Sequence, residues 1–188
     1  MTPPTAAEIA DRALVLYAFA RRATIELALG EFEFEPTRVA QAEAARGETD
    51  RWLERESLTG ALTETERRLF EAESGAWPKP AIDDALWRRE ALGVLLWSLG
   101  HLPEMAPYGE EFPAHELDAA VTRYGSVDAF RVEGQLRPDD EIEAAWMEAD
   151  AWFGATEGRG GEDAAVASTA AERFRALSWL RDADAAPA

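Results

Sequence analysis

Apolar residues recur every three or four positions along most of this sequence, which is the spacing of a helix with one buried face. Two helix starts carry a capping box, Thr5–Glu8 and Thr63–Glu66, in which a hydroxyl and a carboxylate satisfy free amides of the first turn. The segments that we expect to be helical are residues 6–29, 37–57 (as one helix or two shorter ones), 64–74, 81–100, 114–124, 138–153 and 163–181. No internal repeat or strand–turn–strand signal accompanies them. The pattern therefore predicts an all-α fold of about six or seven helices.

Residues 81–100 are the most apolar of these segments, with apolar side chains all round the helix axis. A helix that is apolar on every side is buried in the centre of a fold. We therefore expect one compact domain, residues 5–181, around this helix, between a flexible N-terminus, 1–4, and a flexible tail, 182–188. Residues 31–35 alternate with period two, which predicts an extended connector whose two phenylalanines enter the core.

Four charged residues, Arg89, Glu90, Asp150 and Arg173, stand on helix faces that the pattern would bury. A charge that loses its water costs several kcal/mol unless it is paired or changes protonation state. We therefore expect Glu90 to pair with Arg173, and Asp150 to pair with Arg89 or Arg173. Arginine suits this role because its planar fork can bind a carboxylate and still donate elsewhere.

This set has two interpretations. The first is a structural ion network that fixes the register of the helices. The second is an interior catalytic or ligand-binding site around Glu90, Arg173 and Asp150, in which a carboxylate with a perturbed pKa acts as acid or base. Pairing with arginine lowers the pKa of a carboxyl group and makes it a poor general base, which favours the first interpretation.

The remaining candidates are isolated. His101 follows the central helix, where its protonated form would favour the helix dipole, and catalysis is the alternative role. Glu111, His115 and Asp118 are candidate metal ligands, but no second histidine joins them and a solvated helix start explains them as well. The chain has no cysteine and no His-Glu-x-x-His, Gly-x-x-x-x-Gly-Lys or Gly-x-Ser-x-Gly motif. We therefore expect no metal and no cofactor.

Charge narrows the choice of partner. The 188 residues carry a net charge of −18, and residues 104–157 alone hold 14 acidic and 3 basic residues, a net charge of −11. This field repels phosphates, so we expect neither nucleic acid nor an anionic membrane as partner, whereas a basic protein would be attracted. The acids that we expect to contact it are Asp139, Asp140, Glu141 and Glu143. A charge that only maintains solubility is the alternative.

The acidic charge and the charged residues on buried faces suggest two function classes, and the sequence does not decide between them. It does not determine the oligomeric state either. One is a non-catalytic protein-interaction module that binds a basic protein through residues 104–157. The other is an enzyme or small-ligand binder with the interior site. The longest apolar stretch, residues 91–99, is about half the length of a membrane span, and the start lacks the features of an export signal. Together with the lack of cysteine, this favours the cytoplasm of a bacterial cell.

The segments Arg88–Gly100 and Ala171–Leu180, together with Ala10–Leu16, resemble an uncharacterised bacterial family, domain of unknown function 4272. The likeness touches most of the chain. It implies a helical fold, and it implies no chemistry, because the family has no assigned activity.

Overall fold

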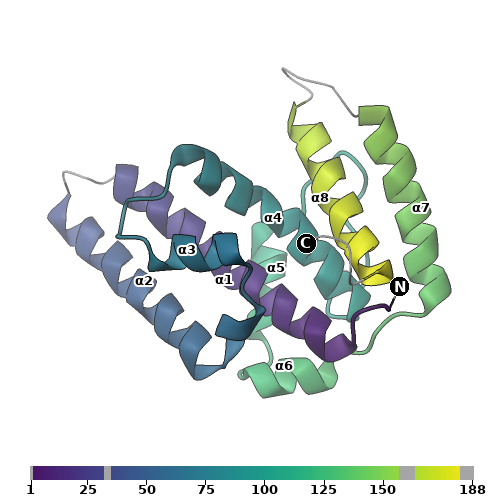
Figure 1. Ribbon diagram of the computed structural model, residues 1–188, viewed down its shortest axis with the longest axis horizontal. Coiled ribbons are helices and arrows are strands. Elements are labelled where there is room, and N and C mark those ends of the chain that lie inside the picture. Colours follow the sequence, from purple (N-terminus) through teal and green to yellow (C-terminus); the bar gives the residue numbers. More distant parts are fainter. Residues whose placement is uncertain (1, 32–34, 157–163, 183–188) are drawn as a thin grey trace. The chain divides into compact units, whose positions relative to one another are not determined.

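The computed structural model describes residues 2–31, 35–156 and 164–182, and every regular element in these ranges is helical (Figure 1). This confirms the all-α prediction, with slightly more helices than expected. The elements are α1 (Ala6–Glu31), α2 (Pro36–Arg55), the 3₁₀ helix η1 (Leu58–Ala61), α3 (Glu64–Glu71), α4 (Lys79–Ser98), α5 (Ala114–Thr122), α6 (Val127–Glu133), α7 (Asp139–Thr156) and α8 (Ala164–Arg181).

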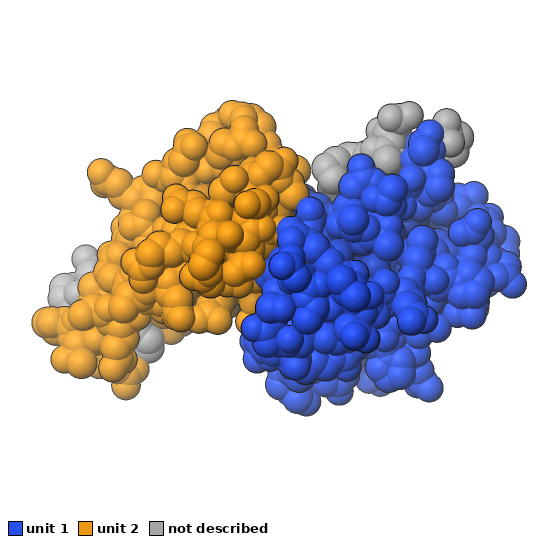
Figure 2. Space-filling model, turned by 90° about the horizontal axis from the view of Figure 1, so that it is seen from below, with its two compact units in different colours: residues 1–13, 87–188 blue, residues 14–86 orange. Residues whose placement is uncertain are grey.

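The chain divides into two compact units, which Figure 2 shows in different colours. Unit 1 comprises residues 1–13 and 87–188, and unit 2 comprises residues 14–86. The boundaries fall inside α1 and α4, so each of these helices belongs to one unit at one end and to the other unit at the other end.

Both capping boxes are present. The Thr5 Oγ1 accepts from the Glu8 N–H at 3.3 Å, and the Thr5 N–H donates to the Glu8 carboxylate at 2.7 Å. Thr63 and Glu66 repeat this reciprocal pair at 3.3 and 2.8 Å. The segment after the first helix, which we expected to fold as one helix or two, is the single helix α2.

The last nine residues of the apolar helix α4, from Glu90 to Ser98, are all buried, as is Leu99 after them. It ends in a Schellman motif, because Gly100 has φ +73°, its N–H donates to the Trp97 carbonyl at 2.9 Å, and the His101 N–H donates to the Leu96 carbonyl at 2.8 Å. A left-handed residue at this point is the conformation that glycine adopts without strain.

Several elements differ from the sequence prediction: η1 was not expected, and α3 ends at Glu71, before the predicted end at residue 74. The helix α6 was missed because its seven residues are too few for a periodic signal, although Ser126 caps it by accepting from the Ala129 N–H at 3.1 Å. The helix α7 runs through Gly154 to Thr156, beyond the predicted end at residue 153. The connector phenylalanines and the tail from residue 183 lie outside the described residues.

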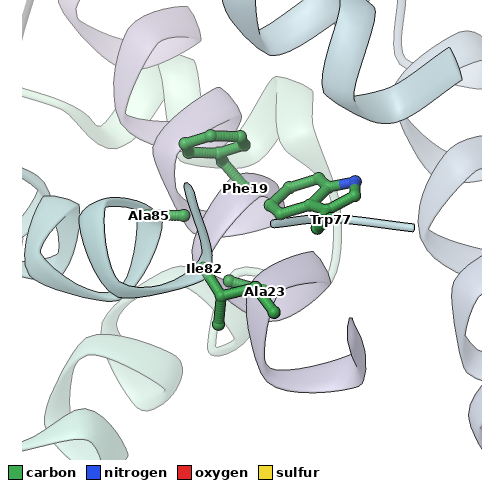
Figure 3. Close-up of a cluster of buried hydrophobic side chains, with 5 residues drawn as sticks. All are labelled: Phe19, Ala23, Trp77, Ile82 and Ala85. Atoms are coloured by element: carbon green, nitrogen blue, oxygen red, sulfur yellow. The ribbon is translucent and has the colours of Figure 1, made fainter. Parts of the chain in front are cut away.

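Unit 2 has an apolar cluster in which Phe19 packs on Trp77 with ring centroids 5.2 Å apart, beside Ala23, Ile82 and Ala85 (Figure 3). The indole Nε1 of Trp77 donates to the Leu69 carbonyl at 2.6 Å, so this buried ring keeps its polar atom satisfied.

In unit 1, α7 and α8 form an antiparallel pair. Phe153 stacks on Phe174 at 5.0 Å, and the Trp146 Nε1 donates to the Ser178 Oγ at 3.0 Å. The pairing brings the C-terminal half of α8, which carries Arg173, into a fixed register along α7.

Candidate functional site

The predicted pair of Glu90 and Arg173 forms in unit 1, between α4 and α8. The Nε and Nη2 of Arg173 each lie 2.8 Å from the Glu90 Oε2, and both side chains are at most 2% exposed. Sequence reasoning found this pair because each residue is a charge among apolar neighbours on its own helix.

Backbone carbonyls satisfy the rest of the Arg173 guanidinium. Its Nη1 donates to the carbonyls of Ala106 at 2.6 Å and Pro107 at 3.3 Å, and its Nη2 donates to the Glu110 carbonyl. The second oxygen of Glu90 accepts from the Phe112 N–H at 2.9 Å. Each guanidinium nitrogen and each carboxylate oxygen therefore has a partner, and together they hold residues 103–113, the larger part of the segment between α4 and α5.

Aromatic rings enclose the same guanidinium. The ring centroids of Phe112 and Trp152 lie 4.7 and 5.6 Å from its central carbon, and Tyr108 packs on Trp152 at 4.8 Å. Gly93 on α4 leaves the space that Phe112 fills, since a Cβ at this position would overlap the phenylalanine ring.

Burial raises the pKa of Glu90 above its ordinary value, although the Arg173 charge and the Phe112 N–H oppose the shift. The pairing with Arg173 lowers the pKa of this carboxyl as we expected, but the loss of water has the larger effect, so the net shift is upward.

Two other predicted members of the network do not join this pair. Asp150 is exposed on α7, so its predicted pairing with Arg89 or Arg173 is wrong. The buried stripe of α7 runs through Ile142, Ala145 and Ala149, and the aromatic neighbours that made Asp150 look buried lie at the edges of that stripe. Arg89 is half-buried on α4.

A second ion pair between α4 and α8, which sequence reasoning missed, involves residues next to the predicted ones. The Arg88 Nε lies 3.7 Å from the Glu172 Oε2, and Arg175 also pairs with Glu172. Glu172 is buried and directly precedes Arg173. The available signal in the sequence was that Glu172 stands between Ala171 and Arg173, on a helix that we expected to be buried.

His101 is buried, and its Nδ1 lies 2.6 Å from the Tyr124 hydroxyl. Burial, with a smaller effect of the Arg123 charge, lowers the pKa of His101 to about 4. The predicted role as a protonated side chain at the helix C-terminus is therefore wrong at neutral pH. His101 does serve the helix end, through its backbone N–H in the Schellman motif.

The three candidate metal ligands, Glu111, His115 and Asp118, are all exposed. Across the ranges that the structure describes, no three His, Asp or Glu side chains are grouped so that they could hold a metal ion.

The four acids predicted to contact a partner lie at the start of α7. Asp139 and Asp140 are exposed. Glu141 pairs with Arg137 at 3.0 Å, and Glu143 pairs with Arg181 at 2.6 Å, each carboxylate remaining nearly half exposed.

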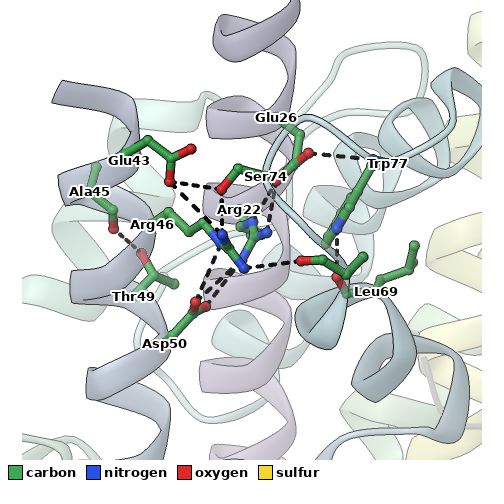
Figure 4. Close-up of polar contacts among 11 residues, drawn as sticks. Arg22, Glu26, Glu43, Ala45, Arg46, Thr49, Asp50, Leu69, Ser74 and Trp77 are labelled. Atoms are coloured by element: carbon green, nitrogen blue, oxygen red, sulfur yellow. Dashed lines mark hydrogen bonds and ion pairs between the residues drawn. The ribbon is translucent and has the colours of Figure 1, made fainter. Parts of the chain in front are cut away.

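Unit 2 contains a polar network that sequence reasoning missed altogether (Figure 4). Arg22 on α1 is fully buried, and its guanidinium contacts Glu26 at 2.8 Å and Asp50 on α2 at 3.2 Å. Arg46 extends the network to the Ala72 carbonyl at 3.0 Å and to Ser74, whose hydroxyl donates to Glu43 at 2.7 Å.

Burial also raises the pKa of Asp50, against the charges of Arg22 and Arg46. The signal for this network was the pair Arg22 and Glu26, four residues apart beside Phe19 and Ala23. We overlooked it because we expected α1 to have one apolar buried face, whereas this helix also buries the charged Arg22 and Glu26.

None of the described helices combines the length and the apolar character of a membrane span. No curated protein and no solved structure matches the chain. One family model matches it, over residues 1–187, under the description Domain of unknown function (DUF4272). With nearly the whole length matched, the chain belongs to this family.

Proposed function

We propose that this protein is a non-catalytic interaction module that binds a basic protein partner through the acidic surface of residues 104–157. The proposal includes a cytoplasmic location, which the lack of cysteine favours.

The observation that carries the proposal is the unequal use of acidic and basic side chains in this region. The exposed acids number twelve, which are Glu104, Glu110, Glu111, Glu116, Asp118, Asp128, Glu133, Asp139, Asp140, Glu141, Glu148 and Asp150. The region's three bases are Arg123, Arg131 and Arg137. The exposed acids therefore outnumber the bases of the region four to one, and this excess leaves a negative field at the surface.

The contacts of these arginines are specific. Arg123 donates to the His101 carbonyl at 2.8 Å, and Arg131 pairs with Asp11 at 2.7 Å. Arg137 donates to the carbonyls of Trp97, Leu102 and Pro103 at 2.9, 3.2 and 2.7 Å. Arg131 and Arg137 also pair with one exposed acid each, Asp128 at 3.4 Å and Glu141 at 3.0 Å, so three bases stand against twelve exposed acids. Such a surface steers a positively charged protein toward it.

The alternative, an interior enzyme or ligand site, is weaker on chemical grounds. Every polar atom of the Glu90 carboxylate and the Arg173 guanidinium already has a partner within the protein. A substrate would have to displace those partners, and Asp150, the third residue of that hypothesis, is exposed.

Affinity capture from a lysate of the native host tests the proposal, with the purified protein as bait at about 50 mM and about 500 mM salt. A double variant, Asp139→Asn with Asp140→Asn, removes two charges from the acidic surface. The matched control, Glu71→Gln with Glu73→Gln, removes two exposed charges from unit 2.

We expect a basic protein that is retained at low salt and released at high salt, that the control variant retains and that the surface variant retains about tenfold less. Equal capture by the two variants, or capture that does not respond to salt, would contradict the proposal.

A further inference from the structure

The outer face of α7 carries a heptad pattern. Its exposed residues follow spacings of four, three, four and three, as in the seam of a coiled coil: Asp140, Ala144, Met147, Ala151 and Gly154. The helix buries the opposite side, through Ala145 and Ala149, in the pair with α8 (Figure 1). A helix that already packs on one side thus presents a second seam to solvent.

The centre of this seam is apolar. Met147 is 55% exposed, which makes it one of the most exposed large apolar side chains in the described part of the chain. Alanine and glycine before and after it let another helix approach closely, while a methionine adapts its shape to whatever packs against it.

Acidic residues flank the seam on both sides. The positions that directly follow a seam residue hold Glu141 and Glu148, and the positions that directly precede one hold Glu143 and Asp150. In a coiled coil these flanking positions choose the partner by charge. Arg137 and Arg181 pair with two of the four acids, whose side chains stay 47% and 44% exposed.

We propose that the outer face of α7 docks an amphipathic helix of the partner, one with apolar residues in a heptad pattern and lysine or arginine at its flanking positions. This inference rests on the proposed function and names the kind of surface that the basic partner presents. A second copy of this chain does not fit, since it would set acids against acids along both flanks.

Two synthetic peptides of about four heptads test the proposal. The first has leucine at the seam positions and lysine at the flanking positions, and the second has the same composition with the heptad order scrambled. The full-length protein is titrated with each peptide at about 50 mM salt, and the dissociation constants are compared. The seam variant is Ala151→Lys, and its matched control is Ala40→Lys at an exposed alanine of α2.

We expect the heptad peptide to bind at least about tenfold more tightly than the scrambled one, and Ala151→Lys to remove that preference while Ala40→Lys preserves it. Equal binding of the two peptides would show attraction by charge alone and overturn the docking mode, with the proposed function intact. Dimerisation of the protein that Ala151→Lys abolishes would overturn it in favour of a second copy. The proposed function is tested by the separate capture experiment, and it is contradicted if no basic protein from the native host binds.

Discussion

Arg22 in unit 2 and Arg173 in unit 1 are both fully buried, yet different groups satisfy them. Arg22 contacts two carboxylates, Glu26 on its own helix and Asp50 on α2. Arg173 contacts one carboxylate, Glu90, and three backbone carbonyls of the segment between α4 and α5. The first arginine links two helices, whereas the second also holds an irregular segment that has few backbone hydrogen bonds of its own.

The difference between the two arginines indicates how much stability each region loses when one carboxylate is removed. Arg22 keeps one carboxylate if it loses the other, and Asp50 is already a third exposed, so water can replace part of the contact. The side-chain contacts of Arg173 in the described part of the chain include one carboxylate, that of Glu90, and its loss leaves a buried cation beside carbonyls that carry no full negative charge.

Glu90→Gln should have the largest effect. Glutamine has one acceptor oxygen where Glu90 uses two, so its amide group must face either the Phe112 N–H or the Arg173 guanidinium, which are both donors. We expect a loss of about 3–5 kcal/mol in the free energy of unfolding, measured by urea denaturation at neutral pH. Stability close to that of the wild type would mean that the pair is not structural.

The pH dependence of stability should be nearly as large. The neutral form of His101 is favoured in the folded state, with a pKa of about 4 against an ordinary 6.5, so the unfolded chain binds more protons between these values. Stability should therefore fall as the pH drops from about 6.5 to about 4, by up to about 3 kcal/mol from this residue. The raised pKa values of Glu90 and Asp50 act in the opposite direction.

The variant His101→Gln isolates this contribution. Urea denaturation at pH 7, 6, 5 and 4 should give a flatter profile for it than for the wild type, whereas His115→Gln, at an exposed position, should leave the profile unchanged. Parallel profiles for the wild type and His101→Gln would contradict the assignment.

Gly93→Ala tests the packing around Arg173. The added methyl group overlaps the Phe112 ring, which must move and disturb both its own N–H contact to Glu90 and its contact with the guanidinium. We expect a loss of about 1–3 kcal/mol, although alanine is the better helix former. Gly47→Ala on α2 is the control, where only the mobile end of Arg51 stands near the new atom. A stabilised Gly93→Ala would show that the ring moves freely.

Asp50→Asn should have the smallest effect and completes the comparison. Arg22 retains Glu26, and Arg46, whose side chain is 23% exposed, retains Ser74 and the Ala72 carbonyl. We expect a loss of about 1 kcal/mol in urea denaturation, well below that of Glu90→Gln. A loss as large as that of Glu90→Gln would remove the distinction between the two arginines.

The features that the sequence predicted are those that depend on helical spacing, namely the helices themselves and the charged residues on their apolar faces. Glu90 and Arg173 stood out because a lone charge on an apolar face must find a partner. The same test failed for Asp150, since large aromatic neighbours at the edge of a buried stripe look identical to neighbours at its centre. We did not look for such a charge at Arg22, because we expected α1 to have one buried face made of apolar residues only.

The backbone contacts of Arg173 and the direction of the pKa shift of Glu90 could not be predicted from the sequence, and the reason is physical. The carbonyls of Ala106, Pro107 and Glu110 bind Arg173 through backbone atoms, which every residue type carries, so no sequence pattern marks them. The dominance of burial over pairing in the pKa of Glu90 likewise depends on how much water the fold removes, which spacing along a helix does not reveal.

The most direct test of this account is amide hydrogen exchange in Arg173→Lys and Arg22→Lys, each compared with the wild type. A lysine keeps the charge but lacks the planar fork that reaches several carbonyls at once. We expect Arg173→Lys to speed exchange within residues 103–113, above all at the Phe112 amide, and to leave α2 unchanged, whereas Arg22→Lys should speed exchange in α2 and leave residues 103–113 unchanged. Unchanged exchange in residues 103–113 of Arg173→Lys would contradict the claim that the Glu90–Arg173 pair stabilises the conformation of that segment.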